Sequence, residues 1–261
     1  MPHPLVDIVI PTFNQLAFAS ACYANLVRHT SHPYTVTFTD DCSTETGLKD
    51  WLLSLHLLGK VGVNINPVRL GFAANCNKGV RMTRGPLICL LNQDTQPQKG
   101  WLDAMCEAIY SDEKIGIVGA KMIFPREKPD GLGGTIQHLG VARKKGGVPF
   151  HPFRGDPVDI PQAVQPRRVN AVTAACMLVK RECWDELGGF DETYRMGNFE
   201  DVDFNWRARD AGWEVFMEPK AVLLHYEHGS GEQYVKEGHD QNRLTLLRRW
   251  HHLESDEHLY E

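Results

Sequence analysis

The sequence predicts an α/β fold in which helices flank a mainly parallel central sheet. Apolar, β-rich runs alternate with helical segments along the first 110 residues, which is typical of parallel strands joined by crossover helices. Several of these runs are almost continuously apolar, as strands covered on both faces are. The 261 residues, 42% of them hydrophobic, suffice for a full-sized core, and we expect a single domain over 1–261.

Six runs are predicted to be strands because they are rich in β-branched and other apolar residues and end at turn-forming residues. They are residues 6–10, 34–39, 86–91, 115–124, 170–179 and 213–218. Helices are predicted where apolar residues recur every three or four positions. These segments are 16–28, 48–58, 72–81, 101–110, 181–187 and 200–211.

Residues 126–168 interrupt this alternation. The segment is too rich in Gly and Pro for regular elements, and we interpret it as a long functional excursion. It lies between the two halves of the chain that carry the polar motifs. It is therefore either a lid that closes over bound substrate or a solvated loop.

The C-terminal segment 241–253 is amphipathic and basic. Such a helix either packs on its own domain or lies on a partner or a membrane surface, and packing on the domain is the favoured interpretation.

Charge and cysteine content exclude several classes of protein. The net charge is −5 and the Lys and Arg residues are scattered, which argues against nucleic-acid binding. Seven cysteines without a CxxC pair indicate reduced thiols in the core. No stretch approaches the roughly 20 apolar residues of a membrane span, so we expect a cytoplasmic protein and leave a peripheral membrane contact open.

Polar residues follow three predicted strands, in PTFN (11–14), DDCST (40–44) and NQDT (92–95). Each alone is explained by turn formation or helix capping. Asp41 and Asp94, however, follow different strands and should meet at one edge of the sheet, where carboxylates bind a metal or a ligand. Neither a GxGxxG fingerprint after the first strand nor a GxxxxGK[ST] loop occurs, which disfavours dinucleotide-dependent oxidoreductases and P-loop kinases.

Two further clusters are candidates for chemistry. Glu200, Asp201 and Asp203 begin a predicted helix, where they either complement the helix dipole or provide a general base with a raised pKa. His225 and His228 follow an apolar run and are either structural or offer an imidazole to the same metal as Asp94.

Taken in order, the motifs resemble those of the family 2 inverting glycosyltransferases with the GT-A fold, over nearly the whole chain. They are VDIVIPTFN (6–14), FTDDCST (38–44), NPVRLGFAANCNKG (66–79), LLNQDTQP (90–97), GGFDE (188–192), FEDVDFNWRARDAG (199–212) and EPKAVLLHYEHGS (218–230). The resemblance is greatest to the rhamnosyltransferase-like subgroup that makes O-antigen and cell-wall polysaccharides. It implies a donor-binding half at about 1–124, an acceptor-side half at about 170–232 and a C-terminal helix at about 233–255.

The resemblance also implies the donor site. Asp41 would bind the base, and Asp94 would be the main ligand of Mn²⁺ or Mg²⁺, with His225 as a second ligand. Asn92 replaces the first acid of the family's DxD motif. The remaining residues that would line the nucleotide pocket or approach the diphosphate or sugar are Pro11, Thr12, Asn14, Gly71, Asn75 and Asn77.

On the acceptor side, the resemblance makes Asp201 the catalytic base and places Glu200 and Asp191 near the acceptor. The implied reaction is a single displacement that inverts the anomeric carbon. The implied donor is a UDP- or dTDP-linked sugar, and the acceptor is a saccharide or a lipid-linked saccharide. The donor sugar, the acceptor and the oligomeric state remain open.

Two alternatives are retained. A sugar nucleotidyltransferase also uses a nucleotide-binding α/β sheet with acids at strand ends, but its glycine-rich N-terminal signature is absent. The other alternative is a catalytically silent nucleotide-sugar-binding module of a larger assembly. The intact Glu200 and Asp201 pair counts against it.

Overall fold

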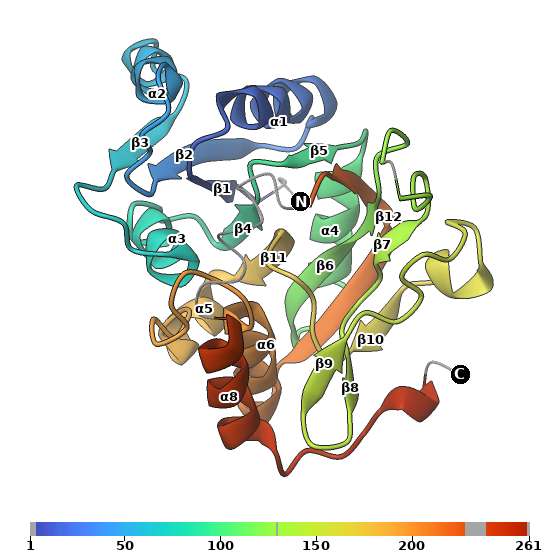
Figure 1. Ribbon diagram of the computed structural model, residues 1–261. Helices are drawn as coiled ribbons and strands as arrows, with labels where there is room; N and C mark the ends of the chain where they lie inside the picture. The colour runs from blue at the N-terminus through green and yellow to red at the C-terminus, as the bar shows by residue number, and fades with distance from the viewer. Residues whose placement is uncertain (1–3, 129, 228–238, 260–261) are drawn as a thin grey trace.

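The computed structural model describes residues 4–128, 130–227 and 239–259, and it confirms the α/β fold (Figure 1). One large sheet runs through the centre. In spatial order its strands are β10 (Arg167–Val169), β12 (Glu214–His225), β6 (Ile115–Ile123), β11 (Cys176–Lys180), β4 (Leu87–Leu91), β1 (Val6–Thr12), β2 (Tyr34–Asp40) and β3 (Gly62–Ile65). Two short strands extend it, β5 (Thr95–Pro97) beside β12 and β7 (Ile136–His138) beside β6.

The sheet is parallel in its N-terminal part and mixed beyond it. Strands β4, β1, β2 and β3 are mutually parallel, as the alternation of runs and helices predicts. Strand β11 lies between β4 and β6 and is antiparallel to both. It can run this way because a long stretch of chain separates it from β6, so no short crossover helix dictates its direction.

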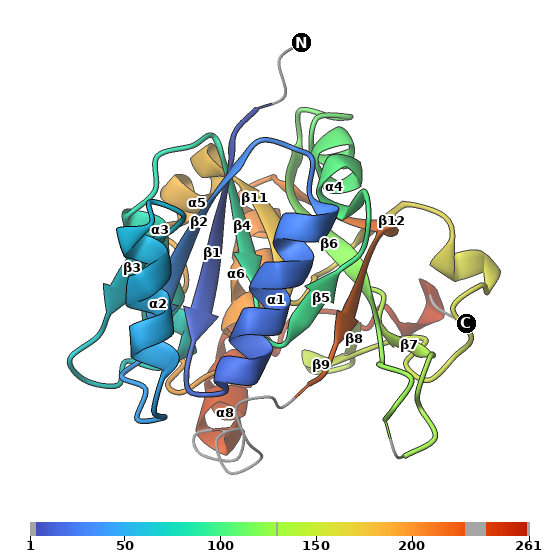
Figure 2. The same cartoon turned by 90° about the horizontal axis from the view of Figure 1, so that it is seen from above.

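Helices cover both faces of the sheet. Buried side chains of α1 (Leu16–His29), α2 (Leu48–Leu57) and α4 (Trp101–Ile109) belong to one core cluster. Those of α3 (Phe72–Arg81), α5 (Arg181–Leu187) and α6 (Glu200–Asp210) belong to a second cluster. In Figure 1, α1 and α2 lie above the strands and α3, α5 and α6 below them. Figure 2 shows α1 and α2 from the side that they cover.

Two strand boundaries differ from those predicted. The predicted strand 170–179 is a strand only at β11, and residues 173–175 line a pocket instead. Strand β12 is longer than the predicted 213–218 because its second half pairs with β5 and continues along β6. This extension puts His225 at a strand end.

The excursion contains regular elements, so the prediction that 126–168 forms none is wrong. Strand β7 pairs with β6, β8 (Ala142–Lys144) forms a hairpin with β9 (Val148–Phe150), and β10 pairs with β12. Buried Lys121 donates hydrogen bonds to the carbonyls of Val158 and Ala163 and so ties the segment to β6. These strands are too short to show a sequence period, whereas the glycine turns between them are conspicuous.

The C-terminal helix α8 (His239–Trp250) packs on the domain, as favoured from its sequence. Its Leu246 and Trp250 are buried against Tyr194, Val202 and Trp206, so α8 covers α6. Six of the seven cysteines are buried, as expected of core thiols, and Cys42 is partly exposed. Within the described ranges, no helix is both long enough and apolar enough to cross a membrane.

Candidate active site

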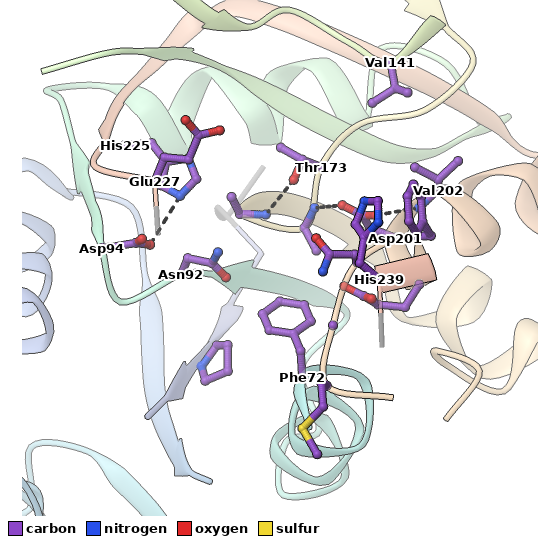
Figure 3. A pocket seen from close by; sticks show the side chains of 18 of the residues that line it. Phe72, Asn92, Asp94, Val141, Thr173, Asp201, Val202, His225, Glu227 and His239 are labelled. Carbon is purple, nitrogen blue, oxygen red and sulfur yellow. Dashed lines mark hydrogen bonds and ion pairs between the residues drawn. The ribbon is translucent and has the colours of Figure 1, made fainter. Parts of the chain in front are cut away.

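A pocket of about 580 Å³ opens where β1, β2 and β4 end and α6 begins (Figure 3). Several parts of the chain line it: the strand ends of the N-terminal half, α3, the excursion, residues 173–175, the segment 196–202 that begins α6, the end of β12 and the first turns of α8. Open α/β sheets bind ligands at the carboxyl ends of their strands. Of the predicted site residues, those that line this pocket are Pro11, Thr12, Asp41, Asn75, Asp94, Glu200, Asp201 and His225.

The predicted nucleotide side is held mainly by backbone groups. Buried Asp41 accepts hydrogen bonds from the backbone N–H groups of Leu70 (2.7 Å) and Gly71 (3.0 Å). The carboxamide of Asn75 bonds Thr39 through both its ends, at 2.7 and 2.8 Å. Both side chains therefore face the pocket with fixed orientations.

Three residues predicted to lie at the donor are behind this wall rather than in it. Asn14 Oδ1 accepts from the backbone of Thr44 at 2.9 Å and orders the loop after β2. Asn77 Nδ2 donates to the carbonyl of Phe190 at 2.9 Å and joins α3 to the segment before α6. Gly71 has φ +85°, and a Cβ there would lie 2.8 Å from the backbone N of Met196, so only glycine allows this close approach.

Asp94 and His225 face each other across the pocket floor (Figure 3). Asp94 Oδ1 lies 3.3 Å from His225 Nε2. The other ring nitrogen, Nδ1, donates to Gln137 Oε1 at 2.6 Å, and Gln137 Nε2 in turn donates to the His225 carbonyl at 3.1 Å. Because the proton of a neutral imidazole is then on Nδ1, Nε2 presents a lone pair beside the carboxylate. Two facing acceptor atoms suit a cation.

The described residues contain no group of three His, Cys, Asp or Glu side chains that could hold a metal ion. His228 lies outside the described residues. Asn92, at the position of the first acid of the DxD motif, lines the pocket, and its buried Oδ1 has no partner among the described residues. Among the described residues, Asp94 and His225 are therefore the charged or imidazole side chains best placed as ligands.

The acidic pair at the start of α6 separates into two environments. Asp201 is partly exposed to the pocket and accepts hydrogen bonds from the backbone N–H of Ala174 (3.0 Å) and of Val202 (2.8 Å). Glu200 is 4% exposed, and this burial, together with the charge of Asp201, raises its pKa well above the usual value. Asp201 is thus the carboxylate oriented at the pocket, and Glu200 is its buried neighbour with a raised pKa.

A backbone segment with unusual dihedral angles leads into α6. Met196, Asn198 and Phe199 have φ of 66°, 79° and 74°. For residues other than glycine, this left-handed conformation is unfavourable in free energy. Asn242 of α8, 1% exposed, donates hydrogen bonds of 2.8 Å to the carbonyls of Arg195 and Gly197. The C-terminal helix therefore holds the segment that positions Glu200 and Asp201.

Asp203 is fully buried and anchors α8 to α6. It accepts hydrogen bonds from Arg207 Nε at 2.8 Å, as its spacing predicts, from an Arg249 guanidinium N–H at 2.7 Å and from Trp250 Nε1 at 2.9 Å. Arg249 also pairs with Asp191 at 2.8 Å. Asp191, which was predicted at the acceptor, is not among the residues that line the pocket.

Sequence reasoning missed several residues that build this site. They are Gln137 and His151 in the excursion and Asn242 in the C-terminal helix. No local signal marks Gln137 and Asn242, because they bond His225 and Gly197, which lie 88 and 45 positions away. His151 lines the pocket directly.

The arrangement of strands and helices is the GT-A fold, and two solved transferases share it. The structure has a TM-score of 0.70 to GalNAc-T7 in complex with UDP, GalNAc and Mn²⁺, at 17% identity over 85% of this chain and 43% of that one. Its TM-score to the mannosyltransferase PcManGT from Pyrobaculum calidifontis, in complex with GDP-Man and Mn²⁺, is 0.65 at 15% identity, over 99% and 67% of the two chains.

Residues 7–146 match the model of glycosyl transferase family 2, and the chain belongs to this family. It is 30% identical, over 95% of its length, to the uncharacterized protein y4gI of Sinorhizobium fredii. The identity is 31% to the O-antigen biosynthesis protein RfbC of Myxococcus xanthus and 30% to the N-acetylglucosaminyl-diphospho-decaprenol L-rhamnosyltransferase of Mycobacterium tuberculosis, over 59% and 55% of this chain. The chain spans 28%, 12% and 48% of the length of these three relatives.

Proposed function

We propose that this glycosyltransferase is inverting and moves a sugar from a nucleoside-diphosphate sugar to a hydroxyl of a saccharide or lipid-linked saccharide. The observation that carries the proposal is that the Asp94 and His225 pair and the oriented carboxylate of Asp201 line one pocket. A charge-neutralising site and a general base at one cavity are what a single displacement at an anomeric carbon requires.

Asp94 and His225 would hold Mn²⁺ or Mg²⁺ in this proposal. A carboxylate oxygen and an imidazole lone pair suit Mn²⁺ in particular, whereas Mg²⁺ prefers oxygen ligands alone. When bound, the ion neutralises charge on the departing nucleoside diphosphate. The two structural neighbours compared above are complexes with Mn²⁺, which supports this assignment.

Asp201 would accept the proton of the attacking hydroxyl. Its two backbone hydrogen bonds fix the carboxylate at the pocket wall, which is the orientation requirement of a general base. Glu200 beside it is buried and has a raised pKa, so in this proposal it would not be the base and would contribute to the acceptor side of the pocket.

The donor and the acceptor follow from the relatives only by analogy. The two structural neighbours are complexes with UDP and with GDP-Man, and one relative is named N-acetylglucosaminyl-diphospho-decaprenol L-rhamnosyltransferase. We propose a UDP- or dTDP-linked donor and a role in polysaccharide biosynthesis. The division into a donor half at about 1–124 and an acceptor half at about 170–232, the cytoplasmic location and a peripheral membrane contact remain predictions from the sequence.

Thermal unfolding with UDP, dTDP, GDP or CDP, in Mn²⁺, Mg²⁺ or EDTA, tests the proposal. A nucleotide at 100 times its Kd adds about 2.7 kcal/mol of stability, which raises Tm by about 5 °C for a chain of this size. We expect one nucleoside diphosphate to do this only with metal, and Asp94→Ala to abolish the shift. Asp50→Ala, a substitution of an exposed aspartate in α2, is the matched control.

Stabilisation by none of the four nucleotides would contradict the proposed donor site. Metal-dependent binding without transfer to any saccharide would instead favour the catalytically silent module. Transfer is followed by release of the nucleoside diphosphate with a panel of octyl glycosides as acceptors.

A further inference from the structure

A pair of histidines from the excursion forms part of the pocket wall and has no role in the reaction proposed above. His138 belongs to β7 and is 2% exposed, and His151 follows β9 and lines the pocket. Their rings pack edge to face with centroids 5.1 Å apart, and their Nδ1 atoms are 3.0 Å apart. One of the two Nδ1 atoms must therefore donate and the other accept.

The direction of this hydrogen bond is determined by the backbone. The N–H of Thr173 donates to His138 Nε2 at 3.4 Å, so that nitrogen carries a lone pair. A neutral His138 then has its proton on Nδ1 and donates it to Nδ1 of His151. His151 in turn carries its own proton on Nε2. Two hydrogen bonds thus select one tautomer of His151.

Both rings are kept neutral by their surroundings. Burial lowers the pKa of His138 well below the usual value. The His151 side chain is exposed at the pocket, and partial desolvation there lowers its pKa, against an opposing effect of the Asp201 carboxylate. Among the described residues, no protein group accepts a hydrogen bond from Nε2 of His151.

We propose that His151 is a fixed hydrogen-bond donor that reads an oxygen atom of the saccharide bound beside Asp201. This inference rests on the proposed function. A donor on the attacking oxygen would reduce its nucleophilicity, so the contacted atom is a neighbouring hydroxyl or ring oxygen of the same sugar residue. His138 is the positioning residue, because it orients His151 and selects its tautomer without lining the pocket.

The tautomer is measured first, by long-range ¹H–¹⁵N correlation on the full chain labelled with ¹⁵N-histidine. We expect a protonated Nε2 and an unprotonated Nδ1 for His151, assigned by the signal that disappears in His151→Gln. In His138→Phe the selection is lost, and the two tautomers exchange. A protonated Nδ1 on His151 in the wild type would overturn the inference. This measurement needs neither substrate nor metal.

Transfer kinetics then test the contact, with the nucleotide sugar and the octyl glycoside that the wild type uses best. His151→Phe keeps the ring but removes the donor, and we expect kcat/KM to fall about tenfold, the value of one neutral hydrogen bond. His151→Gln retains an N–H near the position of Nε2 and should restore activity to within about threefold of the wild type. Nucleoside diphosphate affinity should stay within about twofold in both.

A rise in KM for the octyl glycoside is the expected result and places the contacted oxygen on the acceptor, whereas a rise in KM for the nucleotide sugar alone would overturn the proposed acceptor contact. Unchanged transfer by His151→Phe, or equal losses in the Phe and Gln variants, would overturn the contact. A wild type that transfers to no glycoside would contradict the proposed function instead, and the tautomer measurement would still decide whether the histidine pair is ordered as inferred.

Discussion

The two sides of the pocket are built in different ways. On the proposed nucleotide side, Thr12 ends β1, Asp41 and Asp94 follow the parallel strands β2 and β4, and Asp41 is held by backbone N–H groups of a neighbouring loop. On the proposed acceptor side, Asp201 depends on a backbone segment held by Asn242. His225, the proposed metal ligand beside Asp94, likewise depends on a remote side chain, that of Gln137. The first side is organised by strand ends, the second by side chains distant in sequence.

Because of this difference, substitutions of residues outside the pocket should disturb the acceptor side more than the nucleotide side. A strand end is positioned by the cooperative hydrogen bonds of the whole sheet, so single side chains behind it contribute little to its placement. A carboxylate or imidazole positioned by one or two side chains loses its orientation when either is removed. The predictions below test whether the acceptor side depends in this way on remote residues.

The largest effect is expected at the proposed base. In Asp201→Asn, kcat should fall about 10²–10⁴-fold because the amide cannot accept the proton, while nucleoside diphosphate affinity stays within about twofold. Steady-state transfer and thermal shift measure the two quantities. Asp210→Asn, at the exposed end of the same helix, is the control and should retain wild-type kinetics. Near-normal turnover by Asp201→Asn would remove this residue from the role.

The second largest effect is expected when the hydrogen bond that orients the His225 ring is removed. Gln137→Met leaves Asp94 and His225 intact but removes the acceptor for Nδ1–H, and loss of such a partner typically weakens metal binding about 10–100-fold. The Mn²⁺ concentration that gives half-maximal thermal stabilisation by nucleotide measures this. Gln98→Met removes only a bond to the carbonyl of Gln96 and is the control. Equal Mn²⁺ dependence in both variants would show that His225 needs no orientation.

The segment before α6 provides a smaller, energetic test. Asn242→Leu leaves the carbonyls of Arg195 and Gly197 without their donor, so the unfolding free energy should fall by about 1–3 kcal/mol. Urea unfolding measures it, with Asn25→Leu, which loses one bond within α1, as the control. Similar losses in the two variants would mean that α8 contributes no special support to the acceptor side.

The smallest effect is expected at Glu200 and depends on pH. Its pKa is raised in the folded protein by burial, so above the ordinary glutamate pKa folding requires uptake of a proton, and stability falls as pH rises towards the folded pKa. Glu200→Gln cannot ionise and should therefore gain stability relative to the wild type as pH increases from 5 to 8. Urea unfolding at several pH values detects this. A difference that is constant with pH would show that Glu200 is ionised in the fold.

Several strand-end residues of the pocket follow from the sequence alone. The alternation of apolar runs and helices located β1, β2 and β4, and the polar residues after them identified Asp41 and Asp94 as a convergent pair, while Thr12 was implied by the family resemblance. This worked because parallel strands place their carboxyl ends at one edge, so position along the chain implies position in space. The motif order also led to Asp201 and His225, both of which line the pocket.

The tertiary structure decided which of the candidates face the pocket. Asn14, Asn77 and Asp191 have residue types and motif positions suited to a site, yet their side chains bond other parts of the protein and are not among those that line the cavity. Local sequence could not separate the two groups, because the direction of a side chain at a loop depends on what packs against it.

What the sequence determined by itself was the architecture and the chemical character of the strand ends, since both follow from periodicity and from the geometry of parallel sheets. Only the tertiary structure shows which residues distant in sequence position the side chains of the acceptor side. They are Gln137, His138, His151 and Asn242. Their partners are brought together by the antiparallel β11, the short strands of the excursion and the docking of α8. These are long-range contacts that leave no local pattern in the chain.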